Sequence, residues 1–381
     1  MSSRNRLFLS TDIYNLPRTN DLFVDAMREN ITFHAGVCQS YRRILEHFGF
    51  DLGDIGGIDD LWKIPPLPTL YLKNNTILSK PYEKLLIKTT SSGTGGKKTL
   101  SGYDAGSALC ALSMAVKILR AHSLISLRPT NYIILGVKPD AQNQTATAKA
   151  LRYFTILAPA KSIVYAVKLK DGEYHLDVDG LVNAASKFSA QGLPVRIVGF
   201  PAYFKMLLNE LSKRGIKLNL HKNSKILLGG GWKTFFAEEI SKEELFSMAN
   251  STLGITRKNF KDHFSTAEHP VNYVACENNR FHIPVFSRVI IRCVHTLQPL
   301  ANNKPGILNL ITPLLSSAPY NSILTDDIAT ISSDNCGCGI PSPYFEVIGR
   351  VGLANMRTCT QTASEIKPQG ATNGIAPSTR T

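Results

Sequence analysis

The sequence contains no hydrophobic run that approaches the roughly 18 uncharged apolar residues needed to span a membrane, so no transmembrane helix is expected. Its first residues, MSSRNRLFLSTDIYN, lack the long apolar segment of a secretory signal peptide. Both absences predict a cytoplasmic protein. The chain also lacks a dense Lys/Arg run with interleaved aromatic residues, and it lacks zinc-finger and RNP patterns. Nucleic-acid binding would therefore rest on net charge alone.

Cysteine is scarce and odd in number, with seven residues in 381. In a long chain without a signal peptide, this indicates thiols, metal ligands or a nucleophile and not a disulfide framework. The net charge of +14 suits anionic ligands such as nucleotides, an acidic carrier protein or nucleic acid. A solvated basic surface is the favoured explanation of this charge. Only a steeply salt-dependent affinity for DNA or RNA would establish nucleic-acid binding.

The order of hydrophobic patterns predicts an α/β fold with mainly parallel sheets flanked by helices. Residues 1–60 show helical spacing of apolar residues, and strand-like and helix-like runs then alternate up to about residue 255. Beyond that point the pattern shortens to β-rich pieces. The expected strands are 84–90, 131–137, 194–200 and 224–231, and the expected helices are 104–122, 145–157, 179–190, 201–214 and 239–250. The expected organisation is a helical N-terminal segment (residues 1–80), a core (81–348), a short C-terminal segment (349–366) and a disordered tail (367–381).

A glycine-rich stretch, TTSSGTGGKKT (89–99), lies after a predicted strand and before the helix expected near Asp104. Glycine lets backbone N–H groups approach a phosphate closely, while hydroxyls and a lysine add donors and charge. The Walker pattern is not met, because Lys97 is followed by Lys98 and the earlier glycine position is serine. A plain flexible loop is the alternative. The candidate phosphate-binding residues are Ser91, Ser92, Gly93, Thr94, Gly95, Gly96 and Lys97.

This stretch resembles the phosphate loop of the adenylate-forming enzymes, which activate acyl and aryl acids. Four further segments resemble motifs of that superfamily and occur in the same order. They are LLGGGWK (227–233), FSTAEHP (264–270), ILTDDIA (323–329) and VIGRVG (347–352). Each motif alone is weak, but together they extend over most of the chain and predict an adenylate-forming fold.

Within the superfamily, the lead-in IPPLPTLYLK (64–73), the GGGWK run and the ending RTCTQTASEI (357–366) resemble the acyl-protein synthetases of the LuxE type. The lid is also short, since only about 30 residues follow Arg350. The resemblance implies ATP-dependent conversion of a carboxylic acid, expected to be a fatty acid, to acyl-AMP. The acyl group then passes to Cys359 and onward to a partner such as an acyl reductase.

The resemblance also implies roles for individual residues. Glu268 would hold Mg²⁺, Asp327 would take the ribose hydroxyls in preference to Asp326, and Arg350 would reach the ribose or the phosphate. The chain departs from the superfamily at Ala267, which replaces a threonine, so that Thr266 is the available substitute. The remaining members of the predicted nucleotide and substrate site are Gly229, Gly230, Gly231 and Lys233, of which Lys233 could contact the carboxylate or the α-phosphate in place of a lysine of the full-length lid.

Four of the remaining metal-binding side chains form a second pattern. Cys276 precedes His282 in CENNRFH, and NCGCG contains Cys336 and Cys338. Three cysteines and one histidine are a closed tetrahedral set typical of structural zinc, and some phenylacetate-CoA-ligase-like relatives have similar spacings. Buried thiols beside a hairpin turn are the alternative interpretation.

Two other functions stay open at this point. A ligase that passes the acyl group to coenzyme A or to a carrier-protein thiol would keep full turnover after Cys359→Ala. A non-catalytic subunit that binds a nucleotide or an acyl group would bind ATP without releasing pyrophosphate. The Ala267 departure and the missing lid lysine are the features that favour such a subunit.

Overall fold

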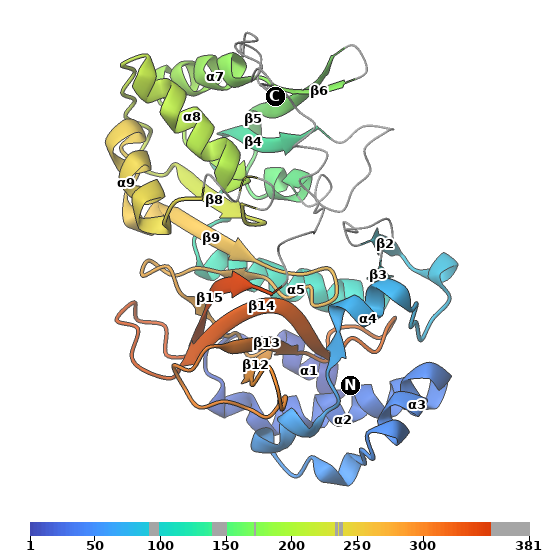
Figure 1. The fold of residues 1–381 in the computed structure, drawn as a ribbon. Coiled ribbons are helices and arrows are strands. Elements are labelled where there is room, and N and C mark those ends of the chain that lie inside the picture. The colour runs from blue at the N-terminus through green and yellow to red at the C-terminus, as the bar shows by residue number, and fades with distance from the viewer. Residues whose placement is uncertain (91–98, 139–150, 171–172, 233–234, 236–238, 352–381) are drawn as a thin grey trace, which may run out of the picture.

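The computed structural model describes residues 1–90, 99–138, 151–170, 173–232, 235 and 239–351. Within these ranges the chain forms two large β-sheets with helices around them, which confirms the predicted α/β class (Figure 1). None of the helices in these ranges combines the length and the hydropathy required of a transmembrane helix. The predicted lid from residue 352 onward and the predicted tail lie outside the described residues.

The first sheet is mainly parallel, and its strands follow the order β10-β9-β8-β7-β4-β5-β6. Pairing is parallel from β5 through β4, β7 and β8 to β9, and antiparallel at the two edges. Strand β4 is buried over nearly its whole length, as expected for a central strand covered on both faces. The strands are β4 (Thr130–Val137), β5 (Ala160–Lys170), β6 (Glu173–Leu176), β7 (Val195–Gly199), β8 (Lys225–Gly229), β9 (Phe260–Phe264) and β10 (Tyr273–Val274).

Helices α7, α8 and α9 lie along one face of this sheet (Figure 1). They are α7 (Val178–Ala190), α8 (Pro201–Lys213) and α9 (Lys242–Leu253). Pro201 stands at the first position of α8, where its missing N–H costs no hydrogen bond, and Gly254 ends α9 with a left-handed φ of 69°. All three correspond to predicted helices.

The sequence patterns missed β5 and β6, although they identified β4, β7 and β8. The expected helix 145–157 is described only from residue 151, where it ends in a 3-10 turn at Phe154–Ile156. Strand β5 is 11 residues long and carries exposed apolar side chains such as Ile163 and Leu169. It lies next to the edge strand β6, so it lacks the continuous buried apolar run that made β4 recognisable.

The second sheet is antiparallel in the order β11-β15-β14-β13-β12. The short strand β1 (Leu67–Pro68) joins it by pairing parallel to β14 at Ile323 and Leu324. This pairing carries the proline-rich lead-in segment into the sheet and starts α4 (Thr69–Asn74) at its edge. The other strands are β11 (Phe281–His282), β12 (Arg288–Arg292), β13 (Gly306–Ile311), β14 (Ser322–Ser332) and β15 (Tyr344–Arg350).

The N-terminal helices cover the second sheet, and α5 lies between the two sheets (Figure 1). Helix α5 follows the hairpin formed by β2 (Ile87–Thr90) and β3 (Leu100–Tyr103), which brackets the glycine-rich stretch. Its buried residues Cys110, Met114 and Ile118 recur every four positions and contribute to one continuous core. The helices are α1 (Ser3–Leu9), α2 (Asn20–Val37), α3 (Gln39–His47) and α5 (Ala105–Ala121).

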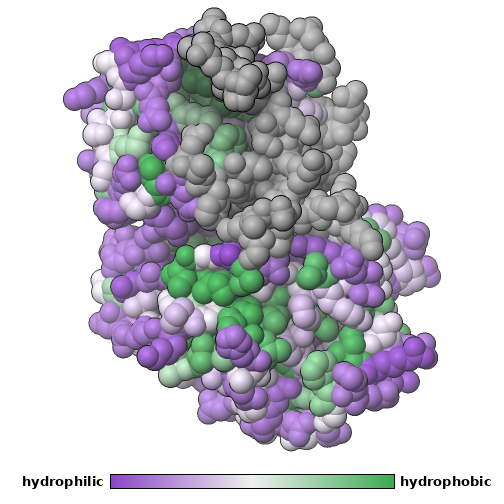
Figure 2. All heavy atoms as spheres, in the orientation of Figure 1, coloured by the Kyte–Doolittle hydropathy of each residue, from purple (hydrophilic) through white to green (hydrophobic). Residues whose placement is uncertain are grey.

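The face shown in Figure 2 is largely hydrophilic in its lower half, apart from a hydrophobic area in the region of β14 and β15. At the end of β15, the side chains of Ile348 and Val351 are 57% and 49% exposed. Arg350 lies between them in the chain, so apolar and charged side chains meet at the end of β15.

Candidate active site

Two of the predicted motifs lie at one edge of the parallel sheet. Strands β8 and β9 are parallel neighbours, so the glycine turn after β8 and the segment after β9 leave the sheet on the same side. Gly230 and Gly231 have φ values of 84° and 69°, and a Cβ on Gly230 would lie 2.7 Å from the ring of Phe200. The turn therefore requires glycine, and it keeps backbone close to the carboxyl ends of β7 and β8.

The segment after β9 forms a turn that fixes the direction of Glu268. The backbone N–H of His269 donates to Thr266 Oγ1 at 2.9 Å. The side chain of His269 is buried, and its Nε2 lies 2.9 Å from the hydroxyl of Tyr273. The Thr266 hydroxyl is thus engaged within its own turn, and His269 anchors the turn in the core.

Glu268 is buried, with only 5% of its surface exposed. Burial raises the pKa of its carboxyl group; the side chain of Thr99 and the charge of Lys73 lower it, and the charge of Asp326 raises it again. Thr99 is the last residue of the glycine-rich stretch, and Asp326 belongs to β14. Glu268 is therefore the point at which the parallel sheet, the end of the predicted phosphate loop and the antiparallel sheet meet.

Around Asp326, charged side chains of both signs come together. Its Oδ1 accepts a hydrogen bond from the Thr69 hydroxyl at 3.1 Å. Its Oδ2 lies 3.7 Å from Lys73 Nζ and 3.5 Å from Arg350 Nη2, and Arg350 Nε lies 3.7 Å from Asp327 Oδ1. Strands β14 and β15 pair Asp327 with Arg350, which explains this proximity. Together with Glu268, the residues Thr69, Lys73, Asp326, Asp327 and Arg350 are called the acidic–cationic cluster below.

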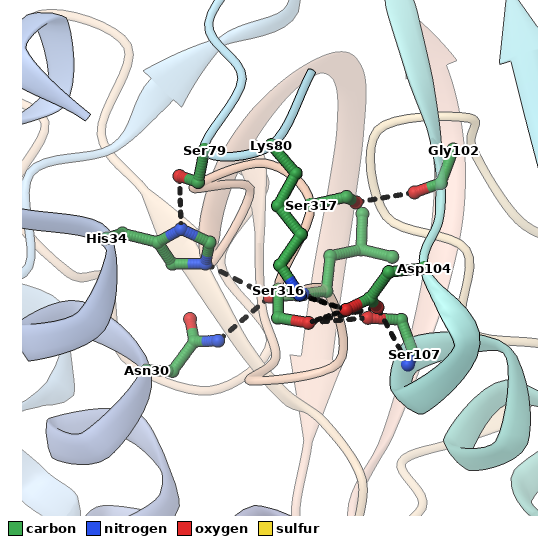
Figure 3. A network of polar contacts seen from close by, with 10 residues as sticks. Asn30, His34, Ser79, Lys80, Gly102, Asp104, Ser107, Ser316 and Ser317 are labelled. Atoms are coloured by element: carbon green, nitrogen blue, oxygen red, sulfur yellow. Dashed lines mark hydrogen bonds and ion pairs between the residues drawn. The ribbon is translucent and has the colours of Figure 1, made fainter. Parts of the chain in front are cut away.

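A largely covered polar network ties the hairpin and the start of α5 to the segment between β13 and β14 (Figure 3). Asp104 caps α5 by accepting from the Ser107 N–H at 2.9 Å, and both of its carboxylate oxygens accept from the Ser316 hydroxyl. Lys80 forms an ion pair with the same carboxylate. The Ser317 hydroxyl donates to the Gly102 carbonyl of β3 at 2.5 Å. These contacts attach the strand after the predicted phosphate loop to the segment between β13 and β14.

The same network reaches helix α2 through His34. Burial lowers the pKa of His34 to about 4, so the ring is neutral near pH 7. Its Nε2 lies 3.0 Å from the Leu315 carbonyl, which can only accept, and its Nδ1 lies 2.6 Å from the Ser79 hydroxyl. The proton therefore belongs on Nε2, and Ser79 donates to Nδ1. We call the residues Asn30, His34, Ser79, Lys80, Asp104, Ser107 and Ser316 the α5 anchor network.

The four residues expected to share a metal ion do come together. The ligand atoms of Cys276, His282, Cys336 and Cys338 all lie within 4.8 Å of one another. Cys276 Sγ is 3.6 Å from Cys336 Sγ, and Cys338 Sγ is 3.2 Å from His282 Nε2. A tetrahedral ion with Zn–S bonds of about 2.3 Å requires sulfur atoms roughly 3.8 Å apart, so the spacing fits.

The fold builds this Cys/His cluster from three separated segments. Cys276 begins the turn after β10, His282 lies on β11, and the two other cysteines lie in the connection from β14 to β15. His282 Nδ1 lies 2.7 Å from the carbonyl of Ser342, which leaves Nε2 directed at the cluster. Gly337, with a φ of 80°, allows the turn between the two cysteines.

Several predicted site residues lie outside the described residues. They are Ser91, Ser92, Gly93, Thr94, Gly95, Gly96, Lys97, Lys233 and Cys359. The structure does describe the strands β2 and β3 on both sides of the glycine-rich stretch, and Trp232 next to Lys233 is buried.

The sequence patterns gave no role to Thr69, Lys73 or Thr99, and they ranked Asp326 below Asp327. Lys73 ends the lead-in IPPLPTLYLK, an otherwise uncharged segment, and that isolated charge was the available signal. Thr99 closes the glycine-rich motif itself. The meeting of Lys73 with Asp326 depends on the pairing of β1 with β14, which no local pattern reveals.

Comparison with known proteins agrees with these features. Residues 2–367 match the family described as acyl-protein synthetase, LuxE. A long-chain-fatty-acid–luciferin-component ligase of Vibrio harveyi is 21% identical over 345 residues, which cover 87% of this chain and 85% of the relative. The ligase of the same name from Aliivibrio fischeri is 21% identical over 349 residues, covering 89% and 87%.

Solved structures show the same fold. 2-Hydroxyisobutyryl-CoA ligase, in an open conformation in complex with 2-HIB-AMP and CoA, has a TM-score of 0.66 at 13% identity and is matched over 89% of this chain and 76% of that chain. The same ligase in its postadenylation state with R3-HIB-AMP has a TM-score of 0.67 at 12% identity, and the match covers 89% of this chain and 69% of that chain. At such identity the likeness concerns the fold alone. The family match, by contrast, spans nearly the whole sequence, and the chain therefore belongs to the acyl-protein synthetase (LuxE) family of AMP-forming acid–thiol ligases.

Proposed function

We propose that this protein activates a fatty acid with ATP and transfers the acyl group to its own Cys359. The observation that carries the proposal is the place of Glu268, a buried carboxylate beside the end of the glycine-rich stretch and beside the carboxylates of β14. The two curated relatives named above act, by their names, on long-chain fatty acids. A fatty acid is thus the substrate to test first.

The reaction has two steps. A carboxylate oxygen of the acid attacks the α-phosphorus of ATP, the bond to the β-phosphate oxygen breaks, and pyrophosphate leaves. The Cys359 thiolate then attacks the acyl carbonyl, the bond to the AMP oxygen breaks, and AMP leaves with that electron pair. A thioester keeps enough reactivity for onward transfer to a partner such as a cytoplasmic acyl reductase. The residues 349–366 would act as the short lid that delivers Cys359.

Different residues of the site would bind different parts of the nucleotide. Backbone N–H groups of Gly93–Gly96, the hydroxyls of Ser91, Ser92 and Thr94, and Lys97 would bind the phosphates. Asp327 would accept the ribose hydroxyls beside Arg350. The turns that would surround the adenine and the acid contain Gly229, Gly230, Gly231, Thr266 and Lys233.

Glu268 would hold Mg²⁺, because a carboxylate is a ligand that this ion prefers and because burial leaves its charge poorly solvated. When bound, the ion would neutralise the charge of the phosphates. The Cys/His cluster would hold Zn²⁺ as a closed structural site, which would tie the β14–β15 connection to β10 and β11.

The experiment combines ATP, Mg²⁺ and radiolabelled acids of different chain length, followed by a denaturing gel. Label that requires ATP, is released by hydroxylamine and disappears in Cys359→Ala is the expected result. Cys293→Ala is the matched control, because Cys293 is half-buried and belongs to neither cluster. Pyrophosphate release without labelled protein would indicate transfer to coenzyme A or a carrier thiol. ATP binding without pyrophosphate release would indicate a non-catalytic subunit.

A further inference from the structure

Lys73 is a largely covered cation in the acidic–cationic cluster. Its side chain is only 14% exposed. Helix α4 places it there, because β1 pairs with β14 and α4 begins at the next residue, Thr69. The Thr69 hydroxyl donates to Asp326 Oδ1, which fixes the first turn of α4 against β14. Lys73 thus lies over β14 at the point where that strand carries its two carboxylates.

Among the residues that the structure describes, the contacts of Lys73 leave its ammonium group weakly held. The distance from Nζ to Asp326 Oδ2 is 3.7 Å, which is longer than a hydrogen bond. Arg350 Nη2 lies 3.5 Å from the same oxygen, so two cations share one carboxylate atom. In the part of the chain that the structure describes, Asp326 Oδ2 is buried without a hydrogen-bond partner. A lysine with three donors is therefore available to an additional anion.

The residues around Lys73 indicate where such an anion would lie. Lys73 acts electrostatically on Glu268, the proposed magnesium ligand, and pairs with Asp326 next to Asp327, the proposed ribose ligand. The α-phosphate is the group that joins the ribose to the rest of the phosphate chain. It must lie between these two ends.

We propose that Lys73 contacts the α-phosphate of ATP and of the acyl-adenylate. The inference rests on the proposed adenylate-forming function and names a further binding residue for it. In the first step the attacked phosphate gains negative charge, and an ammonium group held in a water-poor site stabilises that charge. The rival interpretation is a structural ion pair in which Lys73 only neutralises Asp326.

The test compares the binding of AMP with that of adenosine by calorimetry, because the two ligands differ only in the α-phosphate. For Lys73→Met we expect AMP affinity to fall about 10- to 100-fold, as for loss of a charged hydrogen bond, while adenosine affinity stays as in wild type. Lys73→Arg should keep most of the preference for AMP. The control Lys63→Met removes an exposed lysine paired with Asp60 and should change neither affinity.

The outcomes separate this inference from the function on which it rests. Equal loss of AMP and adenosine affinity, or no loss of either, would overturn the phosphate contact and leave a structural ion pair. If wild type binds neither ligand, the nucleotide site itself is overturned. Lys73→Gln guards against a folding defect, because it keeps a polar, uncharged side chain next to Asp326. It should lose the AMP preference as Lys73→Met does, and a preserved preference would contradict the proposal.

Discussion

The acidic–cationic cluster and the Cys/His cluster are assembled in the same way but differ in how closely their polar atoms approach one another. Each brings together segments that are distant in sequence, and each contains residues on β14 or β15 or on a strand or loop directly connected to them. In the Cys/His cluster every ligand atom faces the others within 4.8 Å. In the acidic–cationic cluster the ion pairs are 3.5–3.7 Å long and a carboxyl group is buried beside like charges. Ligand atoms that all lie close together can share one metal ion and so stabilise the fold. A cluster with long ion pairs and unbalanced charge can instead bind a charged ligand.

The largest expected effect tests the acidic–cationic cluster. Glu268→Gln should lower the rate of pyrophosphate release by about 100- to 1,000-fold, the range for loss of an electrostatic group that acts in the transition state. The free energy of unfolding should not fall, because burial disfavours the charged carboxylate that the substitution removes. Exposed Glu277→Gln is the control. A destabilised Glu268→Gln variant with full activity would reverse the assignment of this cluster.

The second effect tests the Cys/His cluster. Cys336→Ser should abolish bound zinc in elemental analysis and lower the free energy of unfolding by about 4 kcal/mol or more, as when a structural metal is lost. Cys293→Ser, outside the cluster, should change neither quantity. Wild-type protein without zinc, and a Cys336→Ser variant as stable as wild type, would favour buried thiols.

A smaller effect on stability is expected in the α5 anchor network, whose polar groups also contact one another. Asp104→Asn should lower the free energy of unfolding by about 2 kcal/mol, because it weakens charged hydrogen bonds from Ser107, Ser316 and Lys80. Chemical denaturation would measure it, with exposed Asp59→Asn as control.

The same residue has a pH signature. Hydrogen bonds from Lys80 and Ser107 outweigh burial and hold the pKa of Asp104 well below its usual range. Its stabilisation is therefore complete above about pH 4, the unfolded pKa, and is lost as the pH falls further. The difference in stability between wild type and Asp104→Asn should shrink in acid. A difference that stays constant with pH would show that the carboxylate charge is not involved.

The smallest effect concerns His34 in the same network. Its folded pKa of about 4 lies below the ordinary value, so its stabilisation is complete above about pH 6.5 and is lost as the pH falls toward 4. Burial is the main cause; the facing charges of Arg4 and Lys80 add to it and Asp104 opposes it.

Wild type should therefore lose about 1–2 kcal/mol from this group between about pH 7 and pH 5. His34→Gln should reduce that loss in denaturation curves, and exposed His47→Gln should not. Identical pH dependence in both variants would contradict a buried neutral His34.

Local patterns predicted best those elements that bury one continuous apolar face. The uniform apolar run of β4 and the four-residue spacing of α5 were readable for this reason. Strand β5, with exposed Ile163 and Leu169, was not readable. The set Cys276, His282, Cys336 and Cys338 was also predictable, because few residue types bind metals and each spacing is short.

The sequence by itself determined the α/β alternation, the family motifs and the residue types of the Cys/His cluster, since these depend on chemistry carried within short segments. Only the tertiary structure decided that Lys73 and Thr69 meet Asp326 and that Thr99 meets Glu268. Thr69 and Asp326 are 257 positions apart. Their contact arises from the pairing of β1 with β14, and pairing between distant strands is set by the packing of the whole core and not by local propensity.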